Sequence, residues 1–201
     1  MPLKFVAASS QYVYLPSAAV VKNVASASIC SWVYISSFPT GILKQVVFTR
    51  SRGVDVLFER VEIGVDSSSG KLFAGGTPKD GDNVQKFTEA VSSLSTGTWL
   101  HIAATFDFIN RIIRLYTNGV LVDTSAVITL WTSGNSSNTD SLRGSIGSEL
   151  GNAEYFNGLI DDCRLYNYLL SLGEIKNIYG CRGSDMIFNG LEQRFMLNEA
   201  V

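Results

Sequence analysis

Apolar residues recur along the chain in short runs, and turn-forming residues separate most of these runs. The segment Ile29–Ile35 is apolar at both alternating positions, which is typical of a central strand that is covered on both faces. Asn118-Gly119 predicts a two-residue hairpin turn, because both central positions of that turn take positive φ. Many short strands with frequent turns favour a β-sandwich. The pattern predicts strands over Leu3–Ala7, Tyr12–Leu15, Ile29–Ile35, Gln45–Arg50, Val54–Val65, Lys71–Ala74, Gln85–Thr88, Thr98–Asp107, Arg111–Thr117, Val120–Thr124, Leu142–Ile146 and Tyr155–Tyr166.

One helix is predicted after the last of these strands. Ser171 is followed three residues later by Glu174, and this pair forms a capping box at a helix start. Leu172, Ile175 and Ile178 then fall on one helical face. We expect Gly180 to end this helix, because glycine readily takes the left-handed conformation of a helix C-cap.

Composition and charge narrow the class of protein. The chain has 201 residues, of which 46% are hydrophobic and 17% charged, which fits one large all-β domain. The net charge is −2 and there is no basic run, so we expect neither nucleic acid nor an anionic membrane surface as a partner. No apolar run approaches the ~20 residues that a membrane-spanning helix needs. The segment Met1–Val6 lacks the pattern of a signal peptide.

The cysteines and the single histidine limit the chemistry that the chain can perform. Cys30, Cys163 and Cys181 make an odd count, which argues against a disulfide framework, although a Cys30–Cys163 or a Cys163–Cys181 bridge stays open. With one histidine, the chain offers no Cys/His cluster for structural zinc. We interpret His101 as a structural residue rather than a catalytic base.

Four sequence blocks follow one another in the second half of the chain: Trp99–Asp107, Leu115–Gly119, Phe156–Asn167 and Leu170–Ile175. In this order and spacing they resemble the concanavalin A-like, laminin G-like jelly-roll family. The resemblance implies an all-β fold, a jelly-roll sandwich of two antiparallel sheets with one short C-terminal helix. It also implies a recognition scaffold, so an enzymatic function would require identifiable catalytic residues.

The domain predicted from this resemblance covers residues 1–180. Residues 181–201 form a C-terminal extension, because the helix normally ends the module in this family. Within the extension, Leu191–Glu199 looks like the opening strand of another such module. The extension therefore either begins a following module or packs on this domain as an extra strand.

Catalytic carboxylates of the related glucanases lie on one strand with the pattern Glu-x-Asp-x-x-Glu. In retaining glycosidases such carboxyl groups lie ~5 Å apart. The nearest stretch here, Glu62–Asp66, lacks the second glutamate and has its aspartate at the wrong spacing. The sequence therefore predicts that the chain is not an enzyme of this type.

Asp161 is the candidate metal ligand. The run Asp161–Tyr166 resembles the last strand of the family, whose first aspartate can bind calcium together with main-chain oxygens from near the N-terminus. Calcium takes six to eight oxygen ligands, so one carboxylate with carbonyls and waters is a reasonable set. The alternative is a strand-end aspartate that accepts backbone N–H bonds or pairs with Arg164. Asp162, of opposite parity, is interpreted as a buried, hydrogen-bonded strand residue.

Sugar sites usually combine an aromatic platform with amide and carboxylate side chains at a loop rim. Trp32 and Trp99 are assigned to the core, which leaves other aromatic residues beside polar loops as platforms. The candidate ligand-binding residues are Trp131, Tyr155, Asn135, Asn138, Asp140 and Asn152.

These observations favour a non-catalytic carbohydrate-binding or adhesion module of a larger extracellular or virion protein, with calcium as its cofactor. Its expected partners are a glycan or cell-surface polysaccharide and other modules of the same protein, without membrane insertion. One alternative is a structural or assembly module that binds a protein partner. The other is a glycoside hydrolase whose catalytic residues do not follow the known motif.

Overall fold

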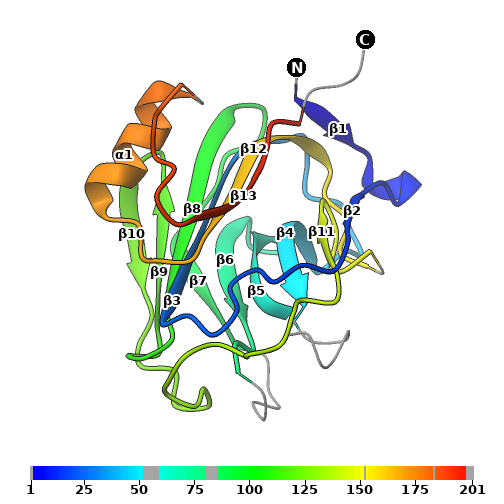
Figure 1. The fold of residues 1–201 in the computed structure, drawn as a ribbon. Helices are drawn as coiled ribbons and strands as arrows, with labels where there is room; N and C mark the ends of the chain where they lie inside the picture. Colours follow the sequence, from blue (N-terminus) through cyan, green and yellow to red (C-terminus); the bar gives the residue numbers. More distant parts are fainter. Residues whose placement is uncertain (1, 52–58, 80–85, 152, 183, 198–201) are drawn as a thin grey trace.

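The chain forms two antiparallel β-sheets that pack face to face, as predicted (Figure 1). The computed structural model describes residues 2–51, 59–79, 86–151, 153–182 and 184–197. The first sheet runs in the order β1 (Leu3–Phe5), β12 (Gly158–Tyr166), β3 (Ser26–Ile35), β8 (Trp99–Asp107), β9 (Ile112–Thr117) and β10 (Val120–Thr124), and β13 (Leu191–Phe195) also pairs with β12. The second sheet runs in the order β2 (Val13–Leu15), β11 (Gly144–Ile146), β4 (Lys44–Ser51), β5 (Glu59–Asp66), β6 (Lys71–Gly76) and β7 (Lys86–Ser93).

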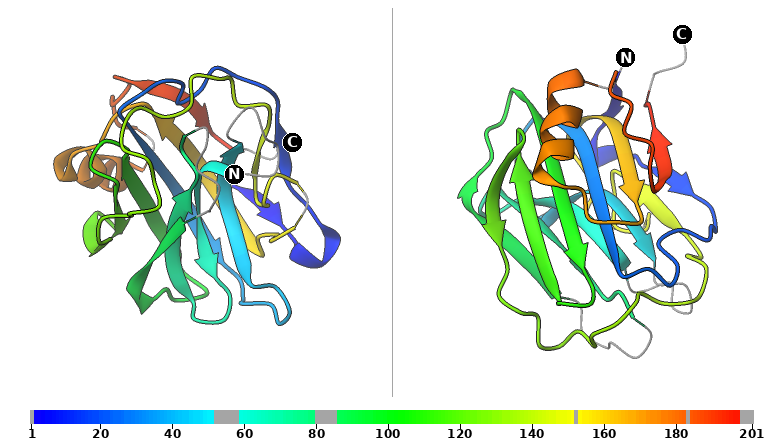
Figure 2. Two further views of the ribbon diagram at one scale, coloured as in Figure 1. Left: turned by 90° about the horizontal axis from the view of Figure 1, so that it is seen from below. Right: turned by 60° about the vertical axis from the view of Figure 1, so that its left-hand side comes forward.

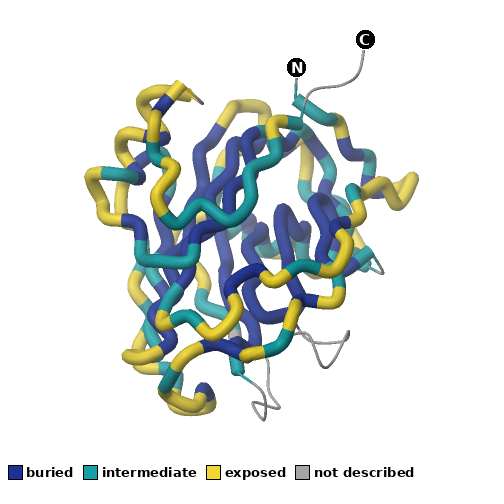
Figure 3. The backbone as a smooth tube through the Cα atoms, in the orientation of Figure 1, coloured by how far each residue is buried: buried dark blue, intermediate teal, exposed yellow. Residues whose placement is uncertain are grey.

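Most residues of the central strands are buried (Figure 3), and the hydrophobic core lies between the two sheets. Alternation along β3 and β8 sends one set of side chains, such as Ile29, Val33 and Ile102, into this core. The other set, which includes Trp32 and His101, lies on the outer face of the first sheet. Trp32 stands directly opposite His101 in the register of β3 and β8. Both faces of β3 are largely buried, as its apolar pattern predicted.

The predicted hairpin joins β9 to β10. Val120 pairs with Thr117, so Asn118 and Gly119 form a two-residue loop with φ values of 50° and 76°. Positive φ at both positions is the signature of a type I′ turn. The predicted strand Val54–Val65 is seen only in part, because residues 52–58 lie outside the described ranges.

The single α-helix in the described part of the chain, α1 (Leu172–Cys181), packs on the outer face of the first sheet (Figure 2, right). Ile175 and Ile178 pack there in one cluster with Cys30 and Ala103. The predicted capping box is present at the helix start. The predicted end is wrong, because the helix continues through Gly180 and the left-handed cap is Arg182, with φ 44°. No helix in the described ranges is long and apolar enough to cross a membrane.

The C-terminal extension folds onto this domain. Its strand β13 pairs antiparallel with β12, from Cys163 opposite Phe195 to Tyr166 opposite Leu191. β1 pairs with the earlier part of β12, while β3 occupies the other edge of β12 along its whole length. The first and last strands therefore share one edge of β12. Of the two arrangements considered for the extension, the extra strand is the one observed.

All three cysteines are free thiols, so neither of the two bridges considered above forms. Cys30 and Cys163 are buried, and Cys181 is exposed. Burial raises the pKa of the Cys30 thiol to about 12, which keeps it protonated and unreactive at neutral pH. The two buried cysteines act as small core residues.

Candidate functional site

A β-bulge in β12 brings two consecutive aspartates to the same face of the sheet. Asp161 stands opposite Trp32, and Arg164 stands opposite Cys30, so β12 holds one more residue than β3 between these pairs. Asp162 lies within the bulge and has a left-handed φ of 47°. Strand alternation predicted opposite faces for Asp161 and Asp162. That prediction is wrong, because the extra residue resets the alternation.

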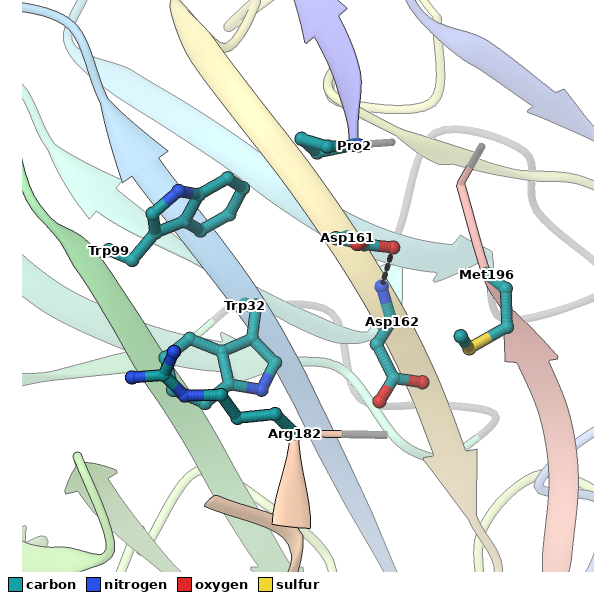
Figure 4. A pocket seen from close by; sticks show the side chains of 7 residues that line it. All are labelled: Pro2, Trp32, Trp99, Asp161, Asp162, Arg182 and Met196. Carbon is teal, nitrogen blue, oxygen red and sulfur yellow. Dashed lines mark hydrogen bonds between the residues drawn. The ribbon is translucent and has the colours of Figure 1, made fainter. Parts of the chain in front are cut away.

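The two aspartates line a pocket of about 280 Å³ on the outer face of the first sheet (Figure 4). It lies between the end of α1, the first residues of the chain and the segment that follows β13. The pocket is lined by Pro2, Trp32, Trp99, Asp161, Asp162, Arg182 and Met196. Aromatic, acidic, basic and thioether side chains therefore meet around one small space.

Trp32 and Trp99 form the aromatic side of this pocket. Trp99 is 39% exposed, whereas Trp32 is 8% exposed and stacks against Tyr179 of α1 with ring centroids 5.6 Å apart. The guanidinium carbon of Arg182 lies 5.5 Å from the Trp32 ring centroid, within the range of a cation–π contact. The Trp32 indole nitrogen has no hydrogen-bond partner among the described residues. Trp99 is thus the accessible platform, and Trp32 forms the wall behind it.

Asp161 is held by the backbone on the other side of the pocket. Its Oδ1 accepts hydrogen bonds from the backbone N–H of Asp162 at 2.8 Å and from that of Leu197 at 3.2 Å. These bonds match the non-metal alternative considered for this residue. They also tie the segment after β13 to the pocket rim. A calcium site at Asp161 stays a prediction.

Asp162 belongs to a buried ionic network beneath the pocket, as the expectation of a buried, hydrogen-bonded strand residue implied. Arg164 donates to both carboxylate oxygens of Asp162 and, at 2.7 Å, to each carboxylate oxygen of Asp185. Arg194 on β13 also donates to Asp162, at 2.8 Å. Burial opposes ionisation of Asp162, but the hydrogen bonds from Arg164 and Arg194 hold its pKa below the usual value. The network fixes one side of the pocket in place.

His101 lies under this site without touching the solvent. Its ring is 5.5 Å from Trp32 and 6.1 Å from Tyr179 by centroid distance. Neither ring nitrogen has a hydrogen-bond partner in the part of the chain that the structure describes. Burial, with the nearby charge of Arg164, lowers the pKa of His101 to about 4. The imidazole is therefore neutral at physiological pH, as a structural histidine would be.

The structure separates the predicted ligand-binding residues from this pocket. Trp131 is buried, and its indole nitrogen donates to the carbonyl oxygen of Gly76 at 2.9 Å, so it is a core residue and not an exposed platform. Asn135 donates to the carbonyl oxygen of Asn23. Asp140 forms an exposed ion pair with Lys22.

The remaining predicted residues do not line the pocket either. The Tyr155 hydroxyl donates to the carbonyl oxygen of Gly151 at 3.3 Å, and its ring lies beside Tyr12. Asn138 is exposed, and Asn152 lies outside the described residues.

Sequence reasoning missed Trp32 and Trp99 as site residues because it assigned both to the core. Strand parity could have found them. Trp99 precedes the core residue Leu100, and Trp32 precedes the core residue Val33, so each tryptophan points away from the core. The register of β3 with β8 then places them on neighbouring strands of one face.

Comparison with known proteins identifies relatives of this fold. The model of one protein family, described as the concanavalin A-like lectin/glucanases superfamily, matches residues 7–176. Among curated proteins, none matches the chain significantly. Many solved structures share its fold at low sequence identity.

Three of these structures illustrate the likeness. A putative carbohydrate-binding protein from Bacteroides ovatus is 16% identical with a TM-score of 0.63, over 97% of this chain and 52% of that one, so this chain spans about half its length. The CBM40 module of the Ruminococcus gnavus IT-sialidase, solved with alpha2,3 sialyllactose, is 16% identical with a TM-score of 0.62, over 85% and 97% of the two chains. Domain 4 of AbnA, an extracellular arabinanase from Geobacillus stearothermophilus solved with arabinotriose, is 19% identical with a TM-score of 0.57, over 89% and 75%. At these identities the likeness shows the fold alone.

Proposed function

Because the chain belongs to the concanavalin A-like lectin/glucanases superfamily, we propose that it is a non-catalytic carbohydrate-binding module. The pocket around Trp99 and Asp161 is its glycan site. The single observation that carries this proposal is the meeting of an exposed tryptophan, two aspartates and an arginine around one small pocket.

Each side chain offers a contact that a sugar can use. The exposed ring of Trp99 offers an apolar surface for the C–H face of a sugar ring. Asp161 supplies a carboxylate acceptor for sugar hydroxyls, and Arg182 supplies several donors. Sites for small molecules combine an apolar lining with a few convergent polar groups in the same way.

The size of the pocket limits what it holds. At about 280 Å³ it lies just below the usual range of ligand sites, roughly 300 to 1,000 Å³. It therefore suits one terminal sugar unit of a glycan, with the rest of the chain directed to solvent. The glycans bound by the R. gnavus module and by domain 4 of AbnA support this class of ligand.

The location of the module and a calcium ion at the rim of its pocket are further parts of the proposed function. A module with this function would act outside the cell or on a virion, as the adhesive part of a larger protein. Calcium at Asp161, with main-chain oxygens, would shape the rim of the pocket. A function without catalysis agrees with the lack of the Glu-x-Asp-x-x-Glu pattern in the sequence.

A glycan-array screen of the purified chain, run with calcium and with chelator, tests the proposal. Trp99→Ala removes the exposed platform, and we expect it to abolish binding to any glycan that the wild-type chain selects. Tyr14→Ala is the matched control, because Tyr14 is an exposed aromatic residue on β2 of the other sheet. Binding lost in chelator and in Asp161→Asn would support calcium at the rim.

Two outcomes would overturn the proposal. Equal glycan binding by the wild-type chain and Trp99→Ala would move the site away from this pocket. No glycan binding in either condition would favour the alternative of a structural module with a protein partner.

A further inference from the structure

A second cluster of acidic side chains lies on the other sheet, away from the pocket. It consists of Glu59 and Glu62 on β5 and Glu149 in the loop after β11. One carboxylate oxygen from each residue lies within 4.8 Å of those of the other two. Glu59 and Glu62 are buried, and Glu149 is half-buried.

The backbone of β5 explains how two of these glutamates meet. Residues three apart on a regular strand point to opposite faces. Here Arg50 stands opposite Val61 while Ser51 stands opposite Glu59, so Arg60 is an extra residue in β5. This bulge turns Glu59 toward the face of Glu62. That face is the outer one, because Val61 and Ile63 on either side of Glu62 point into the core.

The buried carboxyl group of Glu62 lacks a hydrogen-bond partner among the described residues, at either of its two oxygens. Thr49 stands directly opposite on β4, and within the same described ranges its buried hydroxyl also lacks a partner. A buried carboxylate that is neither paired nor hydrogen-bonded is strongly disfavoured, so native proteins rarely leave one. These two adjacent groups on neighbouring strands offer oxygen atoms to a ligand.

The described charged side chains near Glu62 do not hydrogen-bond to its carboxyl group. Burial raises the pKa of Glu62, whereas Lys44 is the nearby cation whose positive charge favours the ionised form of Glu62 and so acts to lower that pKa. Its ammonium nitrogen lies 3.7 Å from the ring centroid of Phe87, and in the described part of the chain it forms no ion pair. The fourth nearby acid, Glu154, accepts a hydrogen bond from the backbone N–H of Lys44. Among the described residues, Lys44 therefore acts on Glu62 through its charge but forms no ion pair with it.

The spacing and type of the oxygens are compatible with a calcium ion. Calcium binds oxygen at roughly 2.3 to 2.6 Å, so two oxygens on opposite sides of one ion lie at most about 5 Å apart. Magnesium usually keeps several waters and is bound through one or two carboxylates, so a set of three protein carboxylates favours calcium. The oxygens of this cluster lie within 4.8 Å of one another, a separation that a calcium ion can bridge. Hard carboxylate oxygens are also the ligand type that calcium prefers.

We infer that Glu59, Glu62 and Glu149 form a calcium site on the outer face of the second sheet, with the Thr49 hydroxyl beside it. The site would tie the loop that contains Glu149 to the face of β5. It is separate from Asp161 and from the glycan pocket, so it does not depend on the proposed function. The competing explanation is that the carboxyl groups share protons and bind no metal.

Calcium titration of the intact 201-residue chain separates these explanations. We expect millimolar calcium, the range of extracellular modules, to raise the melting temperature of the wild-type chain relative to the same chain in chelator. Terbium emission sensitised by tyrosine or tryptophan, displaced by calcium, reports direct binding. Glu62→Gln is expected to weaken calcium binding about tenfold or more, because affinity depends on the number of charged ligands.

Three variants separate loss of calcium binding from loss of folding. In chelator, Glu62→Gln should melt at or above the wild-type temperature, because it replaces a buried carboxyl group that lacks a hydrogen-bond partner among the described residues. Glu149→Gln, in a half-buried loop position, repeats the test if Glu62→Gln does not fold. Glu89→Gln makes the same charge change at an exposed position on β7 and should leave calcium binding unchanged.

Asp161→Asn tests for calcium at the other candidate position. Binding that survives Asp161→Asn and is lost in Glu62→Gln assigns the ion to this cluster. A wild-type chain whose melting temperature and terbium emission do not respond to metal would overturn the inference. Equal calcium affinity in the wild-type chain and Glu62→Gln would overturn it as well.

Discussion

Asp162 and Arg164 stand two residues apart on β12 and form a buried ion pair, in spite of the bulge that begins at Asp162. Arg164 has a second carboxylate partner, Asp185, from the segment between α1 and β13. The ion pair thus links the last core strand to the C-terminal extension. Taking Asp185 away would leave the fully buried Arg164 with Asp162 alone of these two carboxylates, so its charge would be less fully compensated.

The first prediction concerns this network. Asp185→Asn removes one of the two carboxylates on Arg164, and we expect the free energy of unfolding to fall by about 3 kcal/mol. Asp140→Asn is the control, because it breaks the exposed pair with Lys22 and should change stability by less than about 1 kcal/mol. Urea denaturation followed by tryptophan fluorescence measures both. Equal stability of the two variants would show that Asp185 does not support the fold.

The second prediction concerns pH. The pKa of His101 is about 4 in the folded chain and 6.5 in the reference state, so the unfolded chain binds the proton more readily. The stability that the neutral imidazole contributes is complete above about pH 6.5 and is lost as the pH falls toward 4. The total loss over this range is about 3 kcal/mol.

A variant isolates this contribution from other titrating groups. His101→Phe keeps an aromatic ring in the same place and cannot be protonated. The wild-type chain should lose more stability than this variant between pH 6.5 and 4, as measured by urea denaturation at each pH. The carboxyl groups titrate in both proteins, so the difference belongs to His101. Parallel pH profiles would contradict the assignment of a buried neutral histidine.

The third prediction compares the contributions of Trp131 and Trp99 to stability. Trp131→Ala should lower the free energy of unfolding by about 3 to 5 kcal/mol, because it empties a core position and leaves the Gly76 carbonyl oxygen without its donor. Trp99→Ala removes a side chain that is partly in solvent and should cost about 1 kcal/mol or less. Thermal unfolding of both variants, with glycan binding measured in parallel, checks the pair. A larger stability loss in Trp99→Ala would reverse the two assignments.

Local features of the fold could be predicted from the sequence because their causes are local. The turn at Asn118-Gly119 depends on two residues that tolerate positive φ, and the capping box depends on Ser171 and Glu174. The end of α1 was placed too early. Gly180 remains helical, and the chain takes its left-handed turn at Arg182.

Features that depend on strand pairing could not be predicted in the same way. A bulge exists only relative to a partner strand, so the extra residues at Asp162 and Arg60 are invisible in a single sequence. Each bulge moves a carboxylate to the opposite face from the one that alternation predicts. Both acidic groupings of the molecule, at Asp161 and at Glu62, arise from such a shift.

The candidate pocket was hidden for a related reason. Its lining comes from segments far apart in the chain, with Pro2 near one end and Met196 near the other. The sequence predicted a strand in the extension but could not choose between this sheet and another module. Once β13 pairs with β12, the segment after it reaches Asp161 and completes the rim.

The shared edge of β12 also makes the molecule a natural candidate for circular permutation. Leu3 pairs with Ile160 and Phe195 with Cys163, so the outermost strands meet beside the middle of β12. A short peptide could join these strands, and new ends could open at Asn118-Gly119 without changing the order of strands in either sheet. The joining peptide would cross beside the pocket, so its length and composition would offer a direct means of tuning access to the site.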